Sequence, residues 1–250
     1  MDIRFDGKTA LVTGAGSGIG AAIAHELAAS GARVVVADID EGHAKSVVSH
    51  IAKAGGTAMA AGGDVSDPKV VEALVAKASD WDGGLHMLVN NAGIGGPSAP
   101  VGDYPLDGWK HVIDVNLNGV FYGMRYGIPA IRKSGGGSIV NMASILGSVG
   151  FDGASAYVAT KHALLGLTRN AALDHAKEGI RVNAVGPAFI DTPLLDNLPP
   201  GSKEALLALH PIGRLGRVEE VAALTVFLLS DRASFITGSY HLVDGGYTSQ

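Results

Sequence analysis

Three side chains with complementary acid–base chemistry occur close together in the middle of the sequence. Tyr157 and Lys161 stand four residues apart in a predicted helix, so they share one face of that helix. A phenol with a pKa of about 10 is a poor base at neutral pH, but a neighbouring ammonium stabilises the phenolate and lowers that pKa. Ser144 ends the preceding predicted strand, where its hydroxyl can hydrogen-bond a reacting oxygen. These residues indicate proton exchange with an alcohol or a carbonyl compound.

A glycine-rich segment near the N-terminus has the composition of a phosphate-binding loop. Residues 13–20 read TGAGSGIG and lie between the first predicted strand and the first predicted helix. Glycines permit a tight turn there and let backbone N–H groups approach a pyrophosphate at the start of the helix. A Walker A loop would end in Gly-Lys-Ser/Thr, whereas Gly20 is followed by two alanines, so nucleoside triphosphate hydrolysis is disfavoured. The loop residues expected at a dinucleotide are Gly14, Ser17, Gly18, Ile19 and Gly20.

The residue at the end of the second predicted strand indicates which dinucleotide, NAD or NADP, the protein binds. Asp38 stands there, and a carboxylate at this place accepts hydrogen bonds from the adenosine ribose hydroxyls and repels a 2′-phosphate. Ile39 follows it, and residues 15–17 include no Lys or Arg that could receive a phosphate. The sequence therefore predicts NAD rather than NADP as the cofactor, with Asp38 and Ile39 beside the adenosine.

Strands and helices alternate along the chain in the pattern of βαβ units. β-Branched segments predict strands at residues 8–13, 33–37, 57–61, 86–89, 138–141, 180–185 and 240–243. Longer amphipathic segments predict helices at 18–30, 41–54, 68–81, 107–132, 154–177 and 218–230. This alternation predicts the α/β class, with a Rossmann-type doubly wound parallel sheet of about seven strands and helices on both faces. No linker divides the chain, so we expect one domain over residues 1–250, with the long irregular region 187–211 as a substrate lid.

Composition excludes several classes of protein. Hydrophobic residues make up 47% of the 250 residues and charged residues 17%, which excludes wholesale disorder. The net charge of −5 argues against general nucleic-acid binding and against an anionic membrane surface. The absence of cysteine excludes disulfides and thiol chemistry. No apolar run approaches the roughly 20 residues that span a bilayer, and no secretory signal begins the chain, so we expect a soluble, cytoplasmic protein.

Other catalytic sites find little support, although two other classes of function stay open. His25-Glu26 begins a zinc-protease pattern, but position 29 is Ala, so we expect no metal site. No Gly-x-Ser-x-Gly segment indicates a serine hydrolase. A non-catalytic dinucleotide-binding regulator could use the same fold. An S-adenosylmethionine methyltransferase also uses a glycine loop and an acid, but would not require the Tyr157 and Lys161 pair.

The order and spacing of these features resemble the short-chain dehydrogenase/reductase family. The resemblance covers nearly the whole chain, through the glycine loop, Asn90-Asn91-Ala92-Gly93 and Tyr157-x-x-x-Lys161. It implies that Tyr157 is the general acid/base, that Lys161 also holds the nicotinamide ribose and that Ser144 orients the substrate oxygen. It adds Asn116 as a fourth catalytic residue on a water-linked proton path. Further cofactor contacts that it implies are Asp64, Val65, Asn91, Ala92, Gly93, Tyr157, Lys161, Pro187, Ile190 and Thr192.

The resemblance also carries expectations about the turn after Pro187 and about assembly. The family usually has Gly after this proline; here Ala188 follows it and Gly186 precedes it, so we expect a stiffer turn. Family members usually assemble through the helices that here carry Asn116 and Tyr157 and through the C-terminal segment. Apolar residues on more than one face of those helices support the same expectation, a homotetramer.

The residues that follow the cofactor and catalytic motifs predict an apolar substrate pocket. No Arg occurs between Arg181 and Arg214, and Lys203 is the only cation in the lid. Because an anionic substrate normally requires a cationic clamp, we expect a neutral secondary alcohol or its ketone. A reductase of 3-oxoacyl thioesters on an acyl carrier is the alternative within the same family. The expected pocket residues are Ile94, Ser144, Leu146, Phe151, Phe189 and Leu194.

Overall fold

Seven parallel strands form a single sheet at the centre of the molecule. The computed structural model describes residues 3–192 and 202–249. The strands lie in the order β3-β2-β1-β4-β5-β6-β7, and every neighbouring pair is parallel. The chain reverses its direction of travel across the sheet between β3 and β4, so β1 and β4 flank the switch point at which α/β proteins bind ligands. The strands are β1 (Thr9–Thr13), β2 (Arg33–Asp38), β3 (Thr57–Gly62), β4 (Met87–Asn90), β5 (Gly137–Met142), β6 (Ile180–Pro187) and β7 (Tyr240–Val243).

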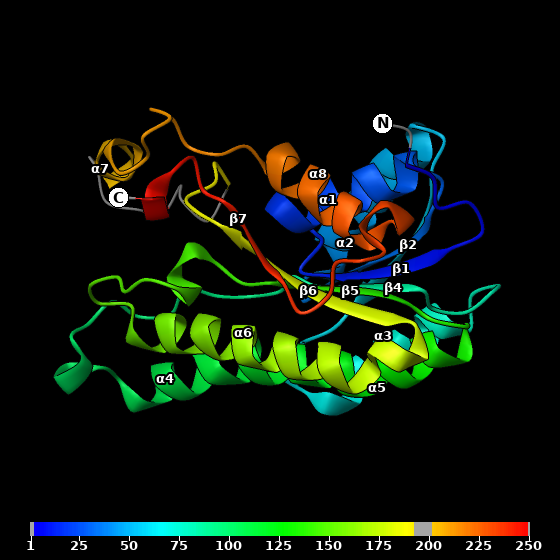
Figure 1. Ribbon diagram of the computed structural model, residues 1–250, viewed down its shortest axis with the longest axis horizontal. Helices are drawn as coiled ribbons and strands as arrows, with labels where there is room; N and C mark the ends of the chain where they lie inside the picture. The colour runs from blue at the N-terminus through cyan, green and yellow to red at the C-terminus, as the bar shows by residue number, and fades with distance from the viewer. Residues whose placement is uncertain (1–2, 193–201, 250) are drawn as a thin grey trace.

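Helices cover both faces of this sheet, as the strand and helix alternation predicts (Figure 1). One face carries α1 (Gly18–Ala29), α2 (Glu41–Lys53) and α8 (Val218–Leu229). The other carries α3 (Pro68–Ser79), α4 (Leu106–Ile113), α5 (Gly119–Lys133) and α6 (Ser155–His175). The short α7 (Ser202–Ala208) lies beside the C-terminal turn. No helix in the described part of the chain is long and apolar enough to cross a membrane.

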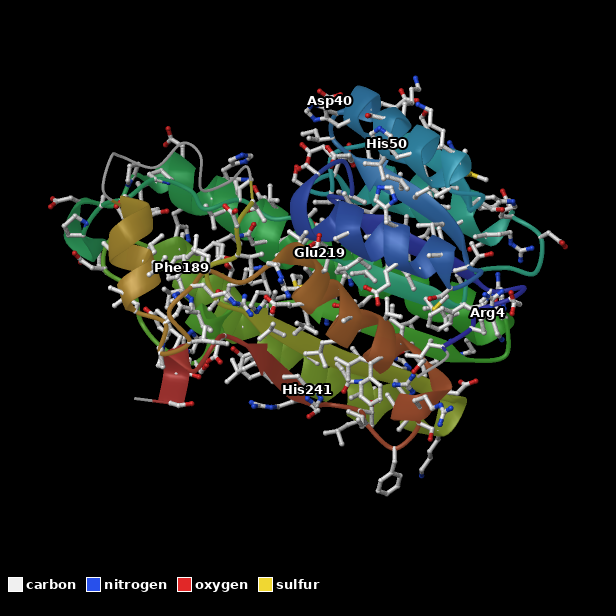
Figure 2. All side chains as sticks on the ribbon, turned by 90° about the horizontal axis from the view of Figure 1, so that it is seen from above. Arg4, Asp40, His50, Phe189, Glu219 and His241 are labelled. Atoms are coloured by element: carbon white, nitrogen blue, oxygen red, sulfur yellow. The ribbon has the colours of Figure 1, made fainter. Side chains whose placement is uncertain are left out.

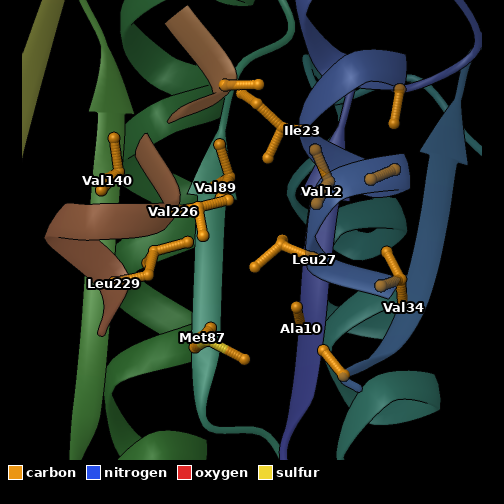
Figure 3. Packing of buried hydrophobic residues seen from close by; sticks show 14 of the residues in the cluster. Ala10, Val12, Ile23, Leu27, Val34, Met87, Val89, Val140, Val226 and Leu229 are labelled. Carbon is orange, nitrogen blue, oxygen red and sulfur yellow. The ribbon is translucent and has the colours of Figure 1, made fainter. Parts of the chain in front are cut away.

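The central strands are buried on both sides because helices pack on each face. All five residues of β1 are buried. Ala10 and Val12 belong to the core beneath α1 and α8, whereas Leu11 belongs to the core on the opposite face. Figure 3 shows the first of these cores, in which Ile23 and Leu27 of α1 meet the sheet. The alternation of β1 side chains between two apolar layers explains the continuous hydrophobic character of this strand.

The structure differs from the predicted elements at two places that concern the site. The predicted helix 107–132 is divided into α4 and α5 by a π-helical turn, Asp114–Asn118, although Pro129 lies inside α5 without ending it. The region 187–211 was expected to be irregular, but it includes α7. Its residues 193–201 lie outside the described residues.

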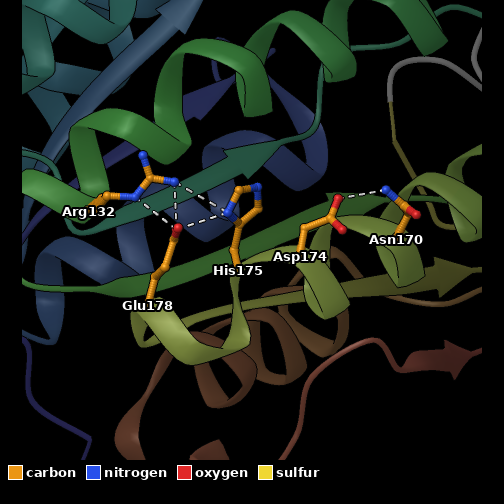
Figure 4. Close-up of polar contacts among 5 residues, drawn as sticks. All are labelled: Arg132, Asn170, Asp174, His175 and Glu178. Atoms are coloured by element: carbon orange, nitrogen blue, oxygen red, sulfur yellow. Dashed lines mark hydrogen bonds and ion pairs between the residues drawn. The ribbon is translucent and has the colours of Figure 1, made fainter.

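The two ends of the sheet have different roles. Phe189, which follows β6, and Arg4, which precedes β1, lie toward opposite ends of the molecule (Figure 2). At the amino end of the sheet, Arg132 in the last turn of α5 and His175 at the end of α6 both contact the Glu178 carboxylate (Figure 4). The Arg132 guanidinium holds the pKa of Glu178 below its ordinary value, with a smaller effect from His175. This cluster joins the two helices at the end opposite the functional residues.

Candidate active site

A cavity of about 590 Å³ opens at the carboxyl ends of the strands and brings the predicted residues together. Most of the predicted cofactor residues line it: Ser17, Gly18, Ile19, Gly20, Asn91, Gly93, Pro187, Ile190 and Thr192. The predicted catalytic residues Ser144, Tyr157 and Lys161 line it too, as do the pocket residues Ile94, Leu146, Phe151 and Phe189. Leu194, the remaining pocket residue, lies outside the described residues.

Glycine is required in the loop between β1 and α1 because the loop turns tightly on itself. Gly14 and Gly18 have positive φ values of 61° and 53°, in the region that L side chains rarely adopt. A Cβ on Gly20 would overlap the carbonyl oxygen of Gly14. The start of α1, residues 17–20, lines the cavity, and the first backbone N–H groups of a helix have no partner within the helix, an arrangement that can bind a pyrophosphate.

Thr13 and Asn91 hold this loop against β4. The Asn91 side chain donates to the carbonyl oxygens of Thr13, at 2.9 Å, and of Gly14, at 3.0 Å. The Thr13 hydroxyl accepts from the backbone N–H groups of Asn91 and Ala92, at 3.0 and 3.2 Å. Thr13 is a functional residue that the sequence analysis missed. Its place as the last residue of the first strand, directly before the glycine loop, is the signal that could have identified it.

Asp38 contacts the glycine loop directly. Its Oδ2 accepts from the Gly16 N–H at 2.8 Å, and its Oδ1 accepts from the Asp40 N–H at 3.0 Å. The carboxylate is thereby held at the end of β2 beside the loop. The Ile39 side chain is exposed, with a relative accessibility of 73%.

Four further predicted cofactor residues, Gly14, Asp64, Val65 and Ala92, do not line the cavity. Asp64 follows β3, and its Oδ1 accepts from the Ser66 N–H at 2.9 Å. Val65 packs with Val115 in a small apolar cluster between β3 and the π-helical turn. Gly14 in the glycine loop accepts from the Asn91 side chain, and Ala92, after β4, donates to the Thr13 hydroxyl.

The acid–base residues meet as their spacing on one helix predicts. Lys161 Nζ lies 5.2 Å from the centroid of the Tyr157 ring. The same ammonium donates to the carbonyl oxygen of Met142, the last residue of β5, at 2.7 Å. The Ser144 hydroxyl hydrogen-bonds Tyr157 and also accepts from the Leu146 N–H, at 3.2 Å. The contact between Lys161 and Met142 is the second one that the sequence analysis missed. Every residue has a backbone carbonyl, so the residue type at position 142 could not reveal it.

Burial shifts both ionisable groups of this site toward their neutral forms. It lowers the pKa of Lys161 to about 8. It raises the pKa of the Tyr157 phenol above its ordinary value, and the hydrogen bond with Ser144 offsets only part of that rise. The stabilisation of the Tyr157 phenolate by Lys161 stays a prediction, since the rise in the Tyr157 pKa comes from burial.

Asn116 lies on the π-helical turn between α4 and α5 and is fully buried. Its side-chain amide pairs with the backbone of Ile94: Oδ1 accepts from the Ile94 N–H and Nδ2 donates to the Ile94 carbonyl, both at 2.8 Å. A Cβ on Gly93 would lie 3.3 Å from Asn116 Oδ1 and 3.8 Å from Lys161 Nζ. The turn therefore places Asn116 close to Lys161 and ties it to the segment after β4.

The segment after β6 reaches the cavity without backbone strain. Ala188 donates from its N–H to the Val243 carbonyl of β7 at 3.0 Å, and no described residue other than glycine has a positive φ. Ile190 forms a bridge with Gly216. Thr192 approaches the glycine loop, since a Cβ on Gly18 would lie 3.5 Å from its Cγ2. The alanine in place of the family glycine is thus accommodated in an ordinary backbone conformation.

Comparison with known proteins agrees with this geometry. A family model described as Enoyl-(Acyl carrier protein) reductase matches residues 14–248. The chain is 49% identical over 250 residues to a cyclohexanol dehydrogenase of Acinetobacter sp. (strain SE19), covering 100% of this chain and 98% of that one. It is 45% identical to the cis-4-hydroxycyclohexanecarboxylate dehydrogenase of Sinomonas cyclohexanicum, over 100% of both chains.

Solved structures show the same fold. A short-chain type dehydrogenase/reductase from Mycobacterium ulcerans matches with a TM-score of 0.93 and 32% identity, over 99% of this chain and 92% of that one. A candidate gluconate 5-dehydrogenase from Beutenbergia cavernae, whose structure contains NADP at low occupancy, matches with a TM-score of 0.93 and 36% identity over 100% of both chains. The chain belongs to the short-chain dehydrogenase/reductase family, as an NAD(P)-dependent enzyme that interconverts secondary alcohols and ketones.

Proposed function

We propose that this enzyme oxidises neutral secondary alcohols on a six-membered carbocyclic ring, and reduces the matching ketones, with NAD as cofactor. The observation that carries the proposal is the apolar end of the cavity. The rings of Phe151 and Phe189 lie there with their centroids 5.7 Å apart. Lys161 is the only cationic residue among the described lining residues, and Met142 engages it. Such a wall favours buried carbon surface, at about 25 cal/mol per Å², over an anionic group.

The names of the relatives support a cyclic substrate. The two relatives described above are named for alcohols on a cyclohexane ring, and others, 45% identical, for a chlorinated cyclohexadiene diol. One of these named substrates carries a carboxylate on the ring. In our proposal this chain prefers the uncharged ring, because the described part of its cavity wall has no free cation for a carboxylate.

In the proposed oxidation, Tyr157 takes the proton of the alcohol as its phenolate. The Ser144 hydroxyl holds the substrate oxygen, and Lys161 stabilises the negative charge of the phenolate through space. The nicotinamide dinucleotide, when bound, supplies the hydride acceptor. Asn116 holds the segment after β4 through Ile94 and so sets the wall on which the substrate ring rests. Ketone reduction uses the same groups, with Tyr157 donating its proton.

The residues around the glycine loop fit a dinucleotide, and Asp38 favours the form without a 2′-phosphate. A Cβ on Gly16 would lie 2.8 Å from Asp38 Oδ2, so the carboxylate stands directly against the loop. A ribose hydroxyl placed there meets a hydrogen-bond acceptor, whereas a phosphate meets a negative charge. We therefore propose that residues 13–20, 38–39, 64–65, 91–93 and 187–192 bind NAD, although the related structure described above contains NADP.

The proposal also covers the domain organisation, the assembly and the cellular location of the protein. We propose one domain over the full chain, a lid formed by residues 187–211, a homotetramer and a cytoplasmic location.

The family model carries the name of an acyl-carrier reductase, and such thioesters are the second candidate substrates. A phosphopantetheine arm carries a phosphate, so the absence of a free cation on the described cavity wall disfavours them.

The test is a matched pair of substrates that differ in one charge. Cyclohexanol and cis-4-hydroxycyclohexanecarboxylate are compared by kcat/KM with NAD and with NADP, with acetoacetyl thioester reduction as a third assay. We expect cyclohexanol with NAD to give a kcat/KM at least about tenfold above the charged ring, because a buried carboxylate without a partner is costly. A tenfold preference for the carboxylate or for the thioester would refute the proposed substrate. Dinucleotide binding without turnover of any alcohol or ketone would indicate a regulator instead.

A further inference from the structure

The last strand of the sheet contacts the catalytic serine through a residue outside the family motifs. We propose that Tyr240 is a positioning residue that sets the orientation of Ser144. Tyr240 begins β7 and does not line the cavity. Its hydroxyl donates to the main-chain carbonyl oxygen of Ser144 at 2.6 Å. The proposal rests on the alcohol and ketone chemistry proposed above, in which the Ser144 hydroxyl holds the substrate oxygen.

The backbone of Ser144 depends on few contacts. Ser144 is extended, with φ −175° and ψ 162°, and caps the short 3-10 turn Ile145–Gly147. Its carbonyl oxygen accepts from the Gly147 N–H, at 2.9 Å, and from Tyr240. The first bond lies within the turn, so it moves when the turn moves. Tyr240 supplies the contact from a separate part of the sheet, which anchors the peptide plane of Ser144.

Small residues make room for the tyrosine ring. A Cβ on Gly186 of β6 would lie 2.6 Å from Tyr240 Cζ, closer than real side chains approach. The ring packs against a cluster formed by Ala143, Leu165 and Ala184. The Tyr240 ring therefore fills space left by a glycine and two alanines in the neighbouring segments. Burial raises the pKa of the Tyr240 phenol, so its hydroxyl stays a hydrogen-bond donor across the working pH range.

The turn that carries Ser144 also lies against the helix that carries the acid–base pair. A Cβ on Gly147 would lie 3.0 Å from the Lys161 carbonyl oxygen. A shift of this turn therefore changes the distance between Ser144 and Tyr157, which share a hydrogen bond. Because that hydrogen bond lowers the Tyr157 pKa, a displaced Ser144 leaves the pKa higher. Loss of the Tyr240 hydroxyl should consequently alter the pH dependence of turnover as well as its rate.

The test removes the Tyr240 hydroxyl and measures whether the effect on turnover depends on Ser144. In Tyr240→Phe we expect kcat for cyclohexanol oxidation to fall about tenfold, the effect of one well-placed hydrogen bond, with the Kd for NADH unchanged. The pH limb of kcat should move to higher pH. In a Ser144→Ala background the Tyr240→Phe change should have no further effect on kcat, because the group that it positions is gone.

Two more variants keep the test decisive. Gly186→Ala displaces the Tyr240 ring but keeps its hydroxyl, and should reproduce the kinetic change. Tyr126→Phe on α5 removes a tyrosine hydroxyl far from Ser144 and should leave kcat and its pH profile unchanged. A wild-type pH profile in Tyr240→Phe, or additive losses with Ser144→Ala, would overturn the proposal. A wild-type enzyme that turns over no alcohol would instead refute the proposed function.

Discussion

Tyr157 and Lys161 are both shifted toward their neutral forms by burial, which sets the pH range in which the site works. Oxidation of an alcohol requires the phenolate of Tyr157, whose pKa is raised. The supporting ammonium of Lys161 has a pKa of about 8, so half of it is neutral at that pH. Reduction of a ketone requires the protonated phenol, which the same shift favours. The two directions of the reaction should therefore respond differently to pH.

We expect kcat/KM for cyclohexanol oxidation to rise from neutral to alkaline pH and that for cyclohexanone reduction to stay nearly constant until the pH approaches the raised pKa of Tyr157. The raised pKa of Tyr157 leaves little phenolate at neutral pH, so each increase in pH adds active base for oxidation, while nearly all of the phenol stays protonated for reduction. Initial rates in both directions, after preincubation at each pH to exclude unfolding, provide the measurement. Parallel profiles in the two directions would contradict this assignment.

Tyr157→Phe should lower kcat by about 10²–10⁴-fold, because it removes only the hydroxyl that transfers the proton. NADH affinity, measured by fluorescence titration, should stay at the wild-type value. Tyr122→Phe on α5 is the matched control and should retain full activity. Near wild-type turnover in Tyr157→Phe would remove this residue from the mechanism.

Asp38 should decide the cofactor preference. In Asp38→Asn we expect the ratio of kcat/KM for NAD over NADP to fall by roughly tenfold, because the charge that repels the 2′-phosphate is lost. Asp40→Asn is the control, since this neighbouring residue caps α2 and asparagine also caps helices. A wild-type enzyme that prefers NADP would overturn the assigned role of Asp38.

At the scale of elements, the start of α8 supports the segment that closes the cavity. Arg214 donates to Glu220 Oε1 and Oε2 at 2.7 and 2.9 Å, and the Arg217 N–H donates to Oε2 at 2.8 Å. Between these arginines, Gly216 pairs with Ile190 at the cavity wall. One carboxylate in the first turn of α8 thus anchors the strand-like segment 214–217 against the segment after β6.

Glu220→Gln should lower the melting temperature at neutral pH but not at strongly acidic pH. Contacts with Arg214 and Arg217 lower the pKa of Glu220 from 4.5 to about 2. A carboxyl group whose pKa is lower in the folded state than in the unfolded state stabilises the folded protein at every pH above the unfolded-state pKa. For Glu220 this contribution is lost as the pH falls from about 4.5 to about 2. Thermal melts across this range test the prediction, with Glu219→Gln as the neighbouring control. A constant difference in melting temperature at every pH would argue against it.

At the scale of the whole molecule, large apolar side chains are exposed on the helical face opposite α1 and α8. Phe121 on α5 has a relative accessibility of 46% and Leu173 on α6 has 81%. α6 carries Tyr157 and Lys161, α5 follows the turn that carries Asn116, and both helices belong to the layer on this face of the sheet (Figure 1). Phe235, before β7, is fully exposed. Exposed apolar residues on two adjacent helices are typical of a surface that packs against another copy.

Light scattering at micromolar concentration should give four times the mass of one chain. Phe121→Glu should reduce that mass, because a carboxylate in an apolar contact is left without a partner. Lys53→Glu on α2, which lies on the other face of the sheet, should leave the mass unchanged. A monomer in the wild-type protein would refute the tetramer.

Much of the site could be predicted because its determinants are local. The spacing of Tyr157 and Lys161 places them on one helix face whatever surrounds that helix. The alternation of strands and helices predicts a parallel sheet, and parallel strands place all their following loops at one edge. Glycines directly after the first strand then stand at that edge together with Ser144. These inferences need no knowledge of packing.

Tertiary structure alone decided the contacts that connect distant segments, because residue type does not record which backbone group a side chain will meet. Lys161 reaches the Met142 carbonyl 19 residues away, and Tyr240 reaches the Ser144 carbonyl 96 residues away. The direction of the Tyr157 pKa shift also depended on packing, since burial of the phenol raises its pKa. The sequence by itself determined the order of the elements and the chemistry of the acid–base pair. The packing of helices on the seven-stranded sheet decided how Tyr157 and Lys161 are buried and oriented, and therefore how they ionise.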